Sequence, residues 1–180
     1  MNLFSRAISF ISRKSDSGFL ILLFAVIYFI SQMIIGSIAH PLGLGNFLAL
    51  QTTLSSDTFK EIVSGWMASG QIGIYYQHFY FDNFHPIWYS IFLSLLIARM
   101  FKINNVHPKF NFIILTPFIA AICDLFENMM HLYFLADLHR ATPVLVALSG
   151  LATNTKWALA ALGVGVVSVL MIVRLRKRSP

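Results

Sequence analysis

Four polar residues interrupt an apolar stretch with a spacing that places them on one side of a helix. Asp124, Glu127, Asn128 and His131 occupy positions i, i+3, i+4 and i+7. At 100° per residue they fall within an arc of roughly 100°, so they form a single polar stripe. In a membrane, each ionised carboxylate costs about 2.5–3.5 kcal/mol on insertion scales. Two carboxylates on one helix therefore require partners, or one of them must be protonated.

Carboxyl and imidazole groups in a polar pocket can perform general acid–base chemistry. We identify Asp124, Glu127 and His85 as the candidate catalytic residues for such chemistry on a lipid-like substrate. The residues leave open whether the chain is an enzyme at all. The candidate ligand-binding residues are Asp82, Tyr89, Asn128, His131, Arg140, Lys156 and Trp157.

The sequence lacks the motifs of several other kinds of catalytic or metal site. The chain has no HExxH, no ExxH pair and no repeated His-x-His spacing, so we predict no metal and no cofactor. It has no GxSxG motif of a serine hydrolase. Its one cysteine, Cys123, cannot form an internal disulfide and is interpreted as a small packing residue.

The composition is that of a membrane protein. Hydrophobic residues make up 57% of the 180 residues, charged residues make up 11%, and the mean hydropathy is +0.73. A soluble chain carries about 25% charged residues, so this one has too little polar surface to cover a water-soluble globule. The sequence predicts one integral membrane domain, residues 1–180, with the lipid bilayer as its surroundings.

Four segments are apolar enough to cross the bilayer, which requires about 20 residues of helix. They are residues 19–38, 84–101, 112–135 and 156–173. The first exceeds the usual length of a signal-peptide core, so we interpret it as a retained anchor. The predicted fold is therefore an all-α membrane protein, a four-transmembrane-helix bundle.

Basic residues indicate the orientation. Cytoplasmic segments of membrane proteins are rich in Lys and Arg. The three basic clusters lie on one side of a four-span chain, which places both termini in the cytoplasm. A basic tail would also fit nucleic acid, but beside an apolar segment it is more simply a topology signal, so we predict no nucleic-acid partner. The clusters are Arg6, Arg13 and Lys14; Arg99, Lys102 and Lys109; and Arg174, Arg176, Lys177 and Arg178.

The long outer loop, about residues 39–83, contains a helix signal at about residues 58–69. Thr58 to Glu61 fits a capping box, and Phe59, Val63 and Trp66 share one apolar face. We interpret this segment as an amphipathic interfacial helix on the outer leaflet. The alternative is a helix that caps the bundle without touching lipid. The following aromatic residues fit a belt at headgroup level: Tyr75, Tyr76, Phe79, Tyr80 and Phe81.

The orientation brings polar residues from three spans together. Asp82 and His85 lie at the outer end of the second span, and Arg140 precedes the fourth. Lys156 and Trp157 begin the fourth span at its outer boundary. We therefore expect a polar pocket in the outer half of the bundle that binds, and in an enzyme transforms, a lipid or small amphipathic ligand. Alternatively, an acid paired with Lys156 is a structural ion pair that fixes helix register.

Small residues on the fourth span suggest close helix packing. Ala161, Gly165 and Ser168 stand at i, i+4 and i+7, a face suited to the interior of the bundle, or alternatively to a homodimer seam. A non-catalytic assembly subunit of a membrane complex is therefore a second functional hypothesis. A proton-coupled transporter is a third, although four spans without an inverted repeat are few unless the protein dimerises.

The order of several motifs resembles a family of uncharacterised small bacterial four-span membrane proteins. The resemblance covers about residues 50–160 and implies a location in the bacterial inner (plasma) membrane. More distantly, the arrangement is similar to the EXPERA group, which includes the sterol isomerase emopamil-binding protein. That similarity implies a sterol-like ligand pocket lined by Asp82, Asp124 and Glu127. The motifs are Trp66 and Gly70, Tyr75, Asp82-x-x-x-Pro86-x-x-Tyr89, Asp124-x-x-Glu127-Asn128, and Lys156-Trp157.

Overall fold

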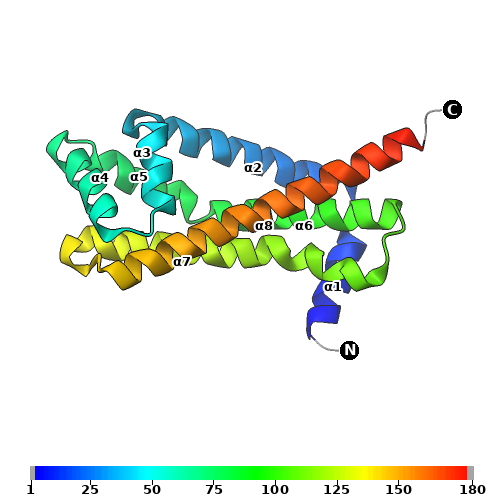
Figure 1. Cartoon of the computed structure of the whole chain (residues 1–180). Coiled ribbons are helices and arrows are strands. Elements are labelled where there is room, and N and C mark those ends of the chain that lie inside the picture. The colour runs from blue at the N-terminus through cyan, green and yellow to red at the C-terminus, as the bar shows by residue number, and fades with distance from the viewer. Residues whose placement is uncertain (1–2, 178–180) are drawn as a thin grey trace.

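A computed structural model describes residues 3–177, so Arg178 of the predicted C-terminal cluster lies outside the described residues. The described chain is helical and contains no strand (Figure 1). Its elements are α1 (Leu3–Lys14), α2 (Gly18–Ala39), η1 (His40–Leu42), α3 (Leu44–Thr52), α4 (Ser56–Ala68), α5 (Ile72–Asp82), α6 (His85–Ile103), η2 (Pro108–Leu115), α7 (Thr116–Ala136), η3 (Leu138–Arg140) and α8 (Pro143–Arg176), where η marks a 3₁₀ helix.

Four segments are helical, long and apolar enough to cross a membrane, which confirms the predicted number of spans. They are Gly18–Leu42, His85–Ile103, Pro108–Ala136 and Pro143–Arg176. Helix α7 packs against α8 and α6, and α2 packs against α6 and α5. Both termini lie at the same end of the long helices (Figure 1).

Helix α8 begins thirteen residues before residue 156, where the fourth span was predicted to start, so the helix extends beyond the predicted span. The Thr142 side chain caps it by accepting the backbone N–H of Leu145, and Pro143 occupies the first turn, where proline is tolerated. With 34 residues at 1.5 Å each, α8 is about 51 Å long, well beyond a hydrocarbon core of about 30 Å. Lys156 therefore lies in the interior of helix α8 and not in its first turn.

The long loop contains three helices, α3, α4 and α5, where the sequence indicated one. Ser55, not Thr58, is the N-cap of α4, because its side chain accepts the backbone N–H of Thr58. On α4, Phe59, Val63 and Trp66 are at most 3% exposed. This apolar face packs on protein, as expected of a helix that caps the other helices.

The predicted aromatic belt divides into two groups. Tyr75 and Phe79 are buried in the core with the apolar face of α4, so their assignment to the belt is wrong. Tyr76, Tyr80 and Phe81 are exposed, as a belt requires. The division follows the helical period of α5, because Tyr75, Phe79 and Asp82 share its inner face.

The helical structure is interrupted between α5 and α6, at Asn83 and Phe84. Pro86, in the first turn of α6, has no backbone N–H to donate to α5 and so favours a new helix. The amide of Asn128 on α7 donates to the freed backbone carbonyl of Asp82, with 3.3 Å between the nitrogen and the oxygen. The break thus places the polar end of α5 beside the polar stripe of α7.

Small residues of α8 pack differently from the prediction. Ala161, Gly165 and Ser168 are all exposed, so their packing inside the bundle is wrong. Gly163 faces α6 instead, where a Cβ atom would lie 2.8 Å from Leu93 Cδ2. This face of α8 was missed, although Ala160 stands one turn before Gly163 on the same side of the helix.

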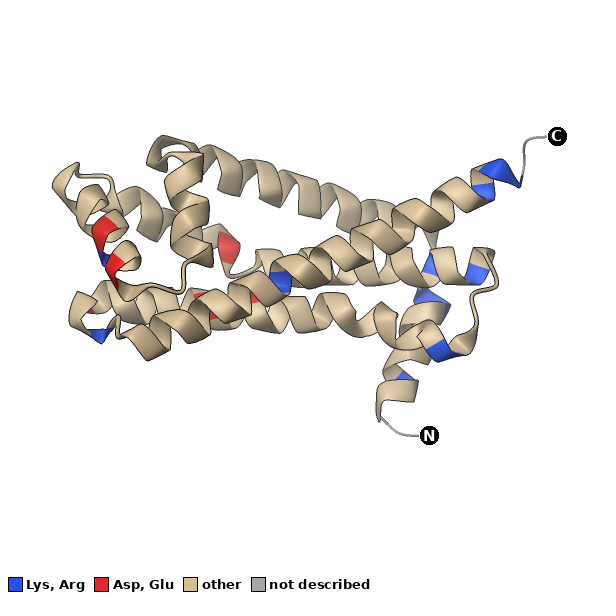
Figure 2. Cartoon of the chain, viewed as in Figure 1, with Lys and Arg blue, Asp and Glu red and all other residues tan. Residues whose placement is uncertain are grey.

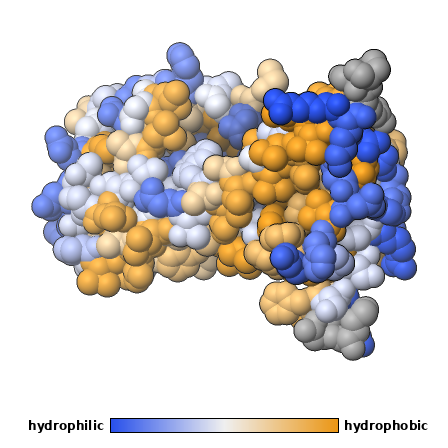
Figure 3. Space-filling view, turned by 45° about the vertical axis from the view of Figure 1, so that its right-hand side comes forward, coloured by the Kyte–Doolittle hydropathy of each residue, from blue (hydrophilic) through white to orange (hydrophobic). Residues whose placement is uncertain are grey.

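The two ends of the molecule differ in charge (Figure 2). The end that holds both termini is basic and has Asp16 as its one acidic residue among residues 3–177. An apolar surface covers the long helices next to this end (Figure 3). The basic residues there are Arg6, Arg13, Lys14, Arg99, Lys102, Lys109, Arg174, Arg176 and Lys177.

Candidate functional site

A buried lysine held by two carboxylates is the centre of the polar cluster. Lys156 Nζ on α8 lies 2.6 Å from Asp124 Oδ1 and 2.5 Å from Glu127 Oε2 on α7. Exposure is 8% for Lys156, 4% for Asp124 and 0% for Glu127. The acids of the third predicted span therefore face the fourth and not lipid, as the pocket hypothesis requires.

A second polar stripe, on α8, completes this arrangement. Ser149, Thr153 and Lys156 stand at i, i+4 and i+7, and all three are buried. Thr153 lies within hydrogen-bonding reach of Glu127. Sequence reasoning missed Ser149 and Thr153 because it began the fourth span at residue 156, although their spacing alone would have indicated the stripe.

The break between α5 and α6 supplies the next part of the cluster. Asp82 is 7% exposed, and its carboxylate Oδ2 lies 3.7 Å from His78 Nε2, one turn earlier on α5. The other ring nitrogen, Nδ1, donates to the backbone carbonyl of Tyr75 at 2.5 Å. His78 is fully buried and was not predicted, although its spacing of four residues from Asp82 places both on one helix face.

His131 belongs to an aromatic part of the cluster. The Tyr75 hydroxyl lies 2.7 Å from His131 Nδ1, and both side chains are buried. Burial, followed by the negative charge of Glu127, raises the pKa of the Tyr75 hydroxyl well above its usual value. This hydroxyl therefore stays protonated and can donate to the imidazole.

His85 lies on the side of the cluster that faces α2. Its Nδ1 is 2.9 Å from the Ser31 hydroxyl, and its ring stacks on Tyr28 with 5.4 Å between centroids. Tyr89, one turn further along α6, lies 5.5 Å from the His85 ring and within hydrogen-bonding reach of Asp124. Tyr89 therefore connects His85 to the central carboxylates.

Two predicted site residues do not join the cluster. Arg140 is exposed at the opposite end from the termini, where it pairs with Asp137 at 3.7 Å and covers the Tyr133 ring. Trp157 is 49% exposed, although Lys156 Nζ lies 5.8 Å from its ring centroid. Arg140 was misplaced because α8 is longer than predicted, which moves its N-terminal end away from Lys156.

Carboxyl groups outnumber Lys and Arg side chains in the cluster. Within residues 3–177, the carboxyl groups of Asp82, Asp124 and Glu127 are buried, and Lys156 is the one buried Lys or Arg side chain. Several buried acceptor atoms have no hydrogen-bond partner within the protein. Unpartnered acceptors of this kind normally cost about 1–3 kcal/mol each, so their concentration points to a ligand or a proton. The atoms are Glu127 Oε1, Asp82 Oδ2, Asn128 Oδ1 and, with its proton on Nδ1, His78 Nε2.

Among residues 3–177, no group of three or more His, Cys, Asp or Glu side chains is arranged to hold a metal ion. Comparison of the chain with protein-family models, with curated proteins and with solved structures found no match.

Protonation of His78 should destabilise the fold. Burial, the largest effect, lowers the pKa of His78, although Asp82 opposes this. The unfolded chain then takes up a proton near the ordinary histidine pKa, about 6.5, that the folded chain resists. Stability is therefore fully present above about pH 6.5 and decreases as the pH falls below it.

We expect His78→Gln to reduce the loss of unfolding free energy between about pH 7.5 and about pH 5. The glutamine amide can still donate to the carbonyl of Tyr75. Unfolding in detergent at both pH values measures the difference. Equal losses in wild type and variant would contradict a buried, neutral His78.

Proposed function

We propose that this chain is a multi-pass protein of the bacterial inner membrane whose polar cluster binds a lipid or small amphipathic ligand by its head group. The four long helices would form a transmembrane bundle, with both termini and the basic end in the cytoplasm. Asp124 and Glu127 can also move a proton on such a ligand, with His85 near them through Tyr89.

The depth of the cluster supports a site in the outer half of the bundle. Lys156 stands 18 residues from Arg174, or about 27 Å along α8. With Arg174 at the cytoplasmic boundary, Lys156 lies towards the far side of a hydrocarbon core of about 30 Å. In this arrangement α4 covers the outer end, and its exposed side meets the outer leaflet or the solvent.

The surplus of buried acceptors carries the proposal. A purely structural ion pair would be balanced, whereas here two carboxylates contact one lysine and a third buried carboxyl group, that of Asp82, lies near His78 without a Lys or Arg contact. Glu127 Oε1, Asp82 Oδ2 and Asn128 Oδ1 are all hydrogen-bond acceptors without a partner in the protein. The complementary head group is therefore a donor, a hydroxyl or an ammonium, and the aromatic and apolar residues around it suit a hydrophobic body.

Neutral variants of the two central acids test this proposal. We expect Asp124→Asn and Glu127→Gln to remain folded but to lose the ligand, or its turnover, when the purified protein is incubated with a lipid extract. Native mass spectrometry of the complex measures binding, and analysis of the extract measures turnover. Glu61→Gln, on the exposed side of α4, is the matched control and should retain both.

A different result would favour the assembly hypothesis. The full burial of Glu127 and the exposed face with Ala161, Gly165 and Ser168 are the observations that support a structural subunit. In that case the two acid variants would be unstable in detergent, and wild-type protein would carry a stoichiometric protein partner and no small molecule. A homodimer through the same face would appear as a doubled mass.

A further inference from the structure

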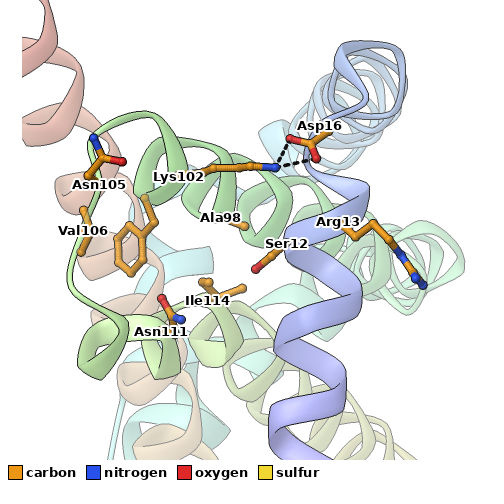
Figure 4. Close-up of a pocket in the computed structure, with 10 residues that line it drawn as sticks. Ser12, Arg13, Asp16, Ala98, Lys102, Asn105, Val106, Asn111 and Ile114 are labelled. Carbon is orange, nitrogen blue, oxygen red and sulfur yellow. Dashed lines mark hydrogen bonds and ion pairs between the residues drawn. The ribbon is translucent and has the colours of Figure 1, made fainter.

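A cavity at the basic end has polar walls and lies outside the cluster described above. It has a volume of about 470 Å³ and lies between α1, α6 and the turn that leads into η2 (Figure 4). Its floor is apolar and includes Ala98 and Ile114. Its polar lining comes from Ser12, Arg13, Asp16, Lys102, Asn105 and Asn111.

The cations of this cavity are not fully neutralised. Lys102 Nζ lies 2.6 Å from both carboxylate oxygens of Asp16, and the pair is more than half exposed. Arg13 has no acidic partner among the lining residues, but its side chain points away from the cavity and adds positive charge outside it (Figure 4). Arg99 donates to the backbone carbonyls of Ser15 and Asp16 beside the cavity. Three cations, Arg13, Arg99 and Lys102, therefore stand against one acid, Asp16, around the cavity, and this net positive charge favours an anion at its mouth.

An apolar groove adjoins the cavity. Phe101 and Val106 line both, so they form a common wall. The groove has a volume of about 410 Å³ and runs along α8 from Leu170 to Leu162, about 12 Å of helix. All of its lining residues are apolar, and Gly165 lies among them, with open space where a Cβ atom would stand.

Helix α1 lies where the proposed orientation puts the cytoplasmic surface of the membrane. It runs across the long helices at the basic end (Figure 1). Ile8 and Ile11 pack against the core between α6 and η2, whereas Leu3 and Phe10 are exposed. Exposed apolar residues beside Arg6 and Arg13 are typical of a basic amphipathic helix that lies in the headgroup region of an anionic leaflet. The cavity at the C-terminal end of α1 is then at headgroup depth.

We infer that this corner binds one anionic phospholipid, with its phosphate head group in the cavity and an acyl chain in the groove of α8. A polar, basic hollow that shares a wall with an apolar groove fits a molecule with those two parts. Basic pockets between helices on the cytoplasmic side are a recognised arrangement for anionic lipid head groups. This site is separate from the polar cluster; it rests on the proposed membrane orientation but not on ligand binding by the cluster.

Native mass spectrometry of the full chain in detergent tests the site with three probes: phosphatidylglycerol, phosphatidylcholine and inorganic phosphate. We expect one phosphatidylglycerol to be retained about tenfold more tightly than phosphatidylcholine, because the basic lining distinguishes the two head groups. Inorganic phosphate should not displace it, because phosphate cannot occupy the groove.

Two variants test the apolar groove and the basic cavity separately. Gly165→Phe places a ring at the groove, with no atom within 4 Å of its Cβ, and should weaken phosphatidylglycerol binding about tenfold. Ser168→Phe is the matched control, because Ser168 is exposed on the same helix and outside the groove. Combined Arg13→Gln and Lys102→Gln should remove the preference for phosphatidylglycerol over phosphatidylcholine while the acyl chain still binds.

Equal retention of the two lipids by wild-type protein would overturn the inference, as would undiminished binding by Gly165→Phe. Displacement of the lipid by inorganic phosphate would indicate a site for a soluble anion instead. Glu127→Gln should leave this lipid in place, so the site can be tested independently of the polar cluster.

Discussion

Replacing Lys156 with methionine is expected to destabilise the fold by about 3–5 kcal/mol, because it leaves two buried carboxyl groups without their cation. Methionine matches the length and apolar character of the lysine stem, so packing is largely preserved. The free energy of unfolding in mixed detergent micelles with increasing denaturing detergent measures the change. This expectation rests on the distances of 2.5–2.6 Å and on the burial of all three side chains.

The pair formed by Lys102 and Asp16 provides a matched control. It has the same 2.6 Å separation, but its side chains are 57% and 55% exposed. Exposed ion pairs contribute about 0–1 kcal/mol, so Lys102→Met should change the unfolding free energy little in lipid-free detergent. A similar small effect of Lys156→Met would contradict a buried ion cluster.

Neutralising the acids as well should restore stability. We expect the triple variant Lys156→Met, Asp124→Asn, Glu127→Gln to recover most of the loss, because neutral amides remove the cost of two buried charges that lack a cation. The same variant should not recover ligand binding. Recovery of both would mean that the charges are dispensable for stability and for ligand binding, which would contradict recognition of the ligand by these carboxylates.

The centre of the cluster could be predicted from the sequence because its parts are local. The stripe formed by Asp124, Glu127 and Asn128 follows from the helical period alone, and their inward direction follows from the cost of a carboxylate in lipid. Basic residues also identified the end of the molecule where both termini lie. Lys156 then remained as the nearest cation in an adjacent span.

The parts of the fold and site that the sequence did not predict depend on contacts between segments distant in sequence. The first half of α8 contains Ser149, Gly150, Thr153 and Asn154, which lower its hydropathy, so it did not resemble a membrane span. Those residues are polar because they face α3 and the cluster: the Asn154 amide, for example, donates to the backbone carbonyl of Thr52. Hydropathy alone cannot distinguish a loop from a helix whose polar side is covered by another part of the chain.

The segment before α6 also shows that the sequence alone does not reveal which side chains another segment covers. Tyr75 and Phe79 were expected in a belt at the membrane surface, since aromatic residues near a span usually lie there. Their burial depends on α4, whose apolar face packs with them in one core. His78 lies between them on the same buried face of α5, so the error about the aromatic residues also concealed a member of the site.

Replacing Gly150 with alanine is expected to separate α8 from α3 and to cost roughly 3 kcal/mol. A Cβ atom at Gly150 would overlap the backbone carbonyl oxygen of Thr53 and lie 2.9 Å from Leu54 Cδ2. A flexible side chain could turn away, but a carbonyl moves only with its backbone. Unfolding in mixed micelles measures the cost, and Gly165→Ala is the matched control on the same helix.

The control variant, Gly165→Ala, should not lose stability. Nothing lies within 4 Å of a Cβ atom at Gly165, and alanine favours a helix over glycine by about 1 kcal/mol, so Gly165→Ala should be neutral or stabilising. Gly150→Ala should also weaken ligand binding, because Thr153 and Lys156 follow within two turns and move with the helix. Unchanged stability and binding would mean that the contact with Thr53 does not position the polar stripe of α8.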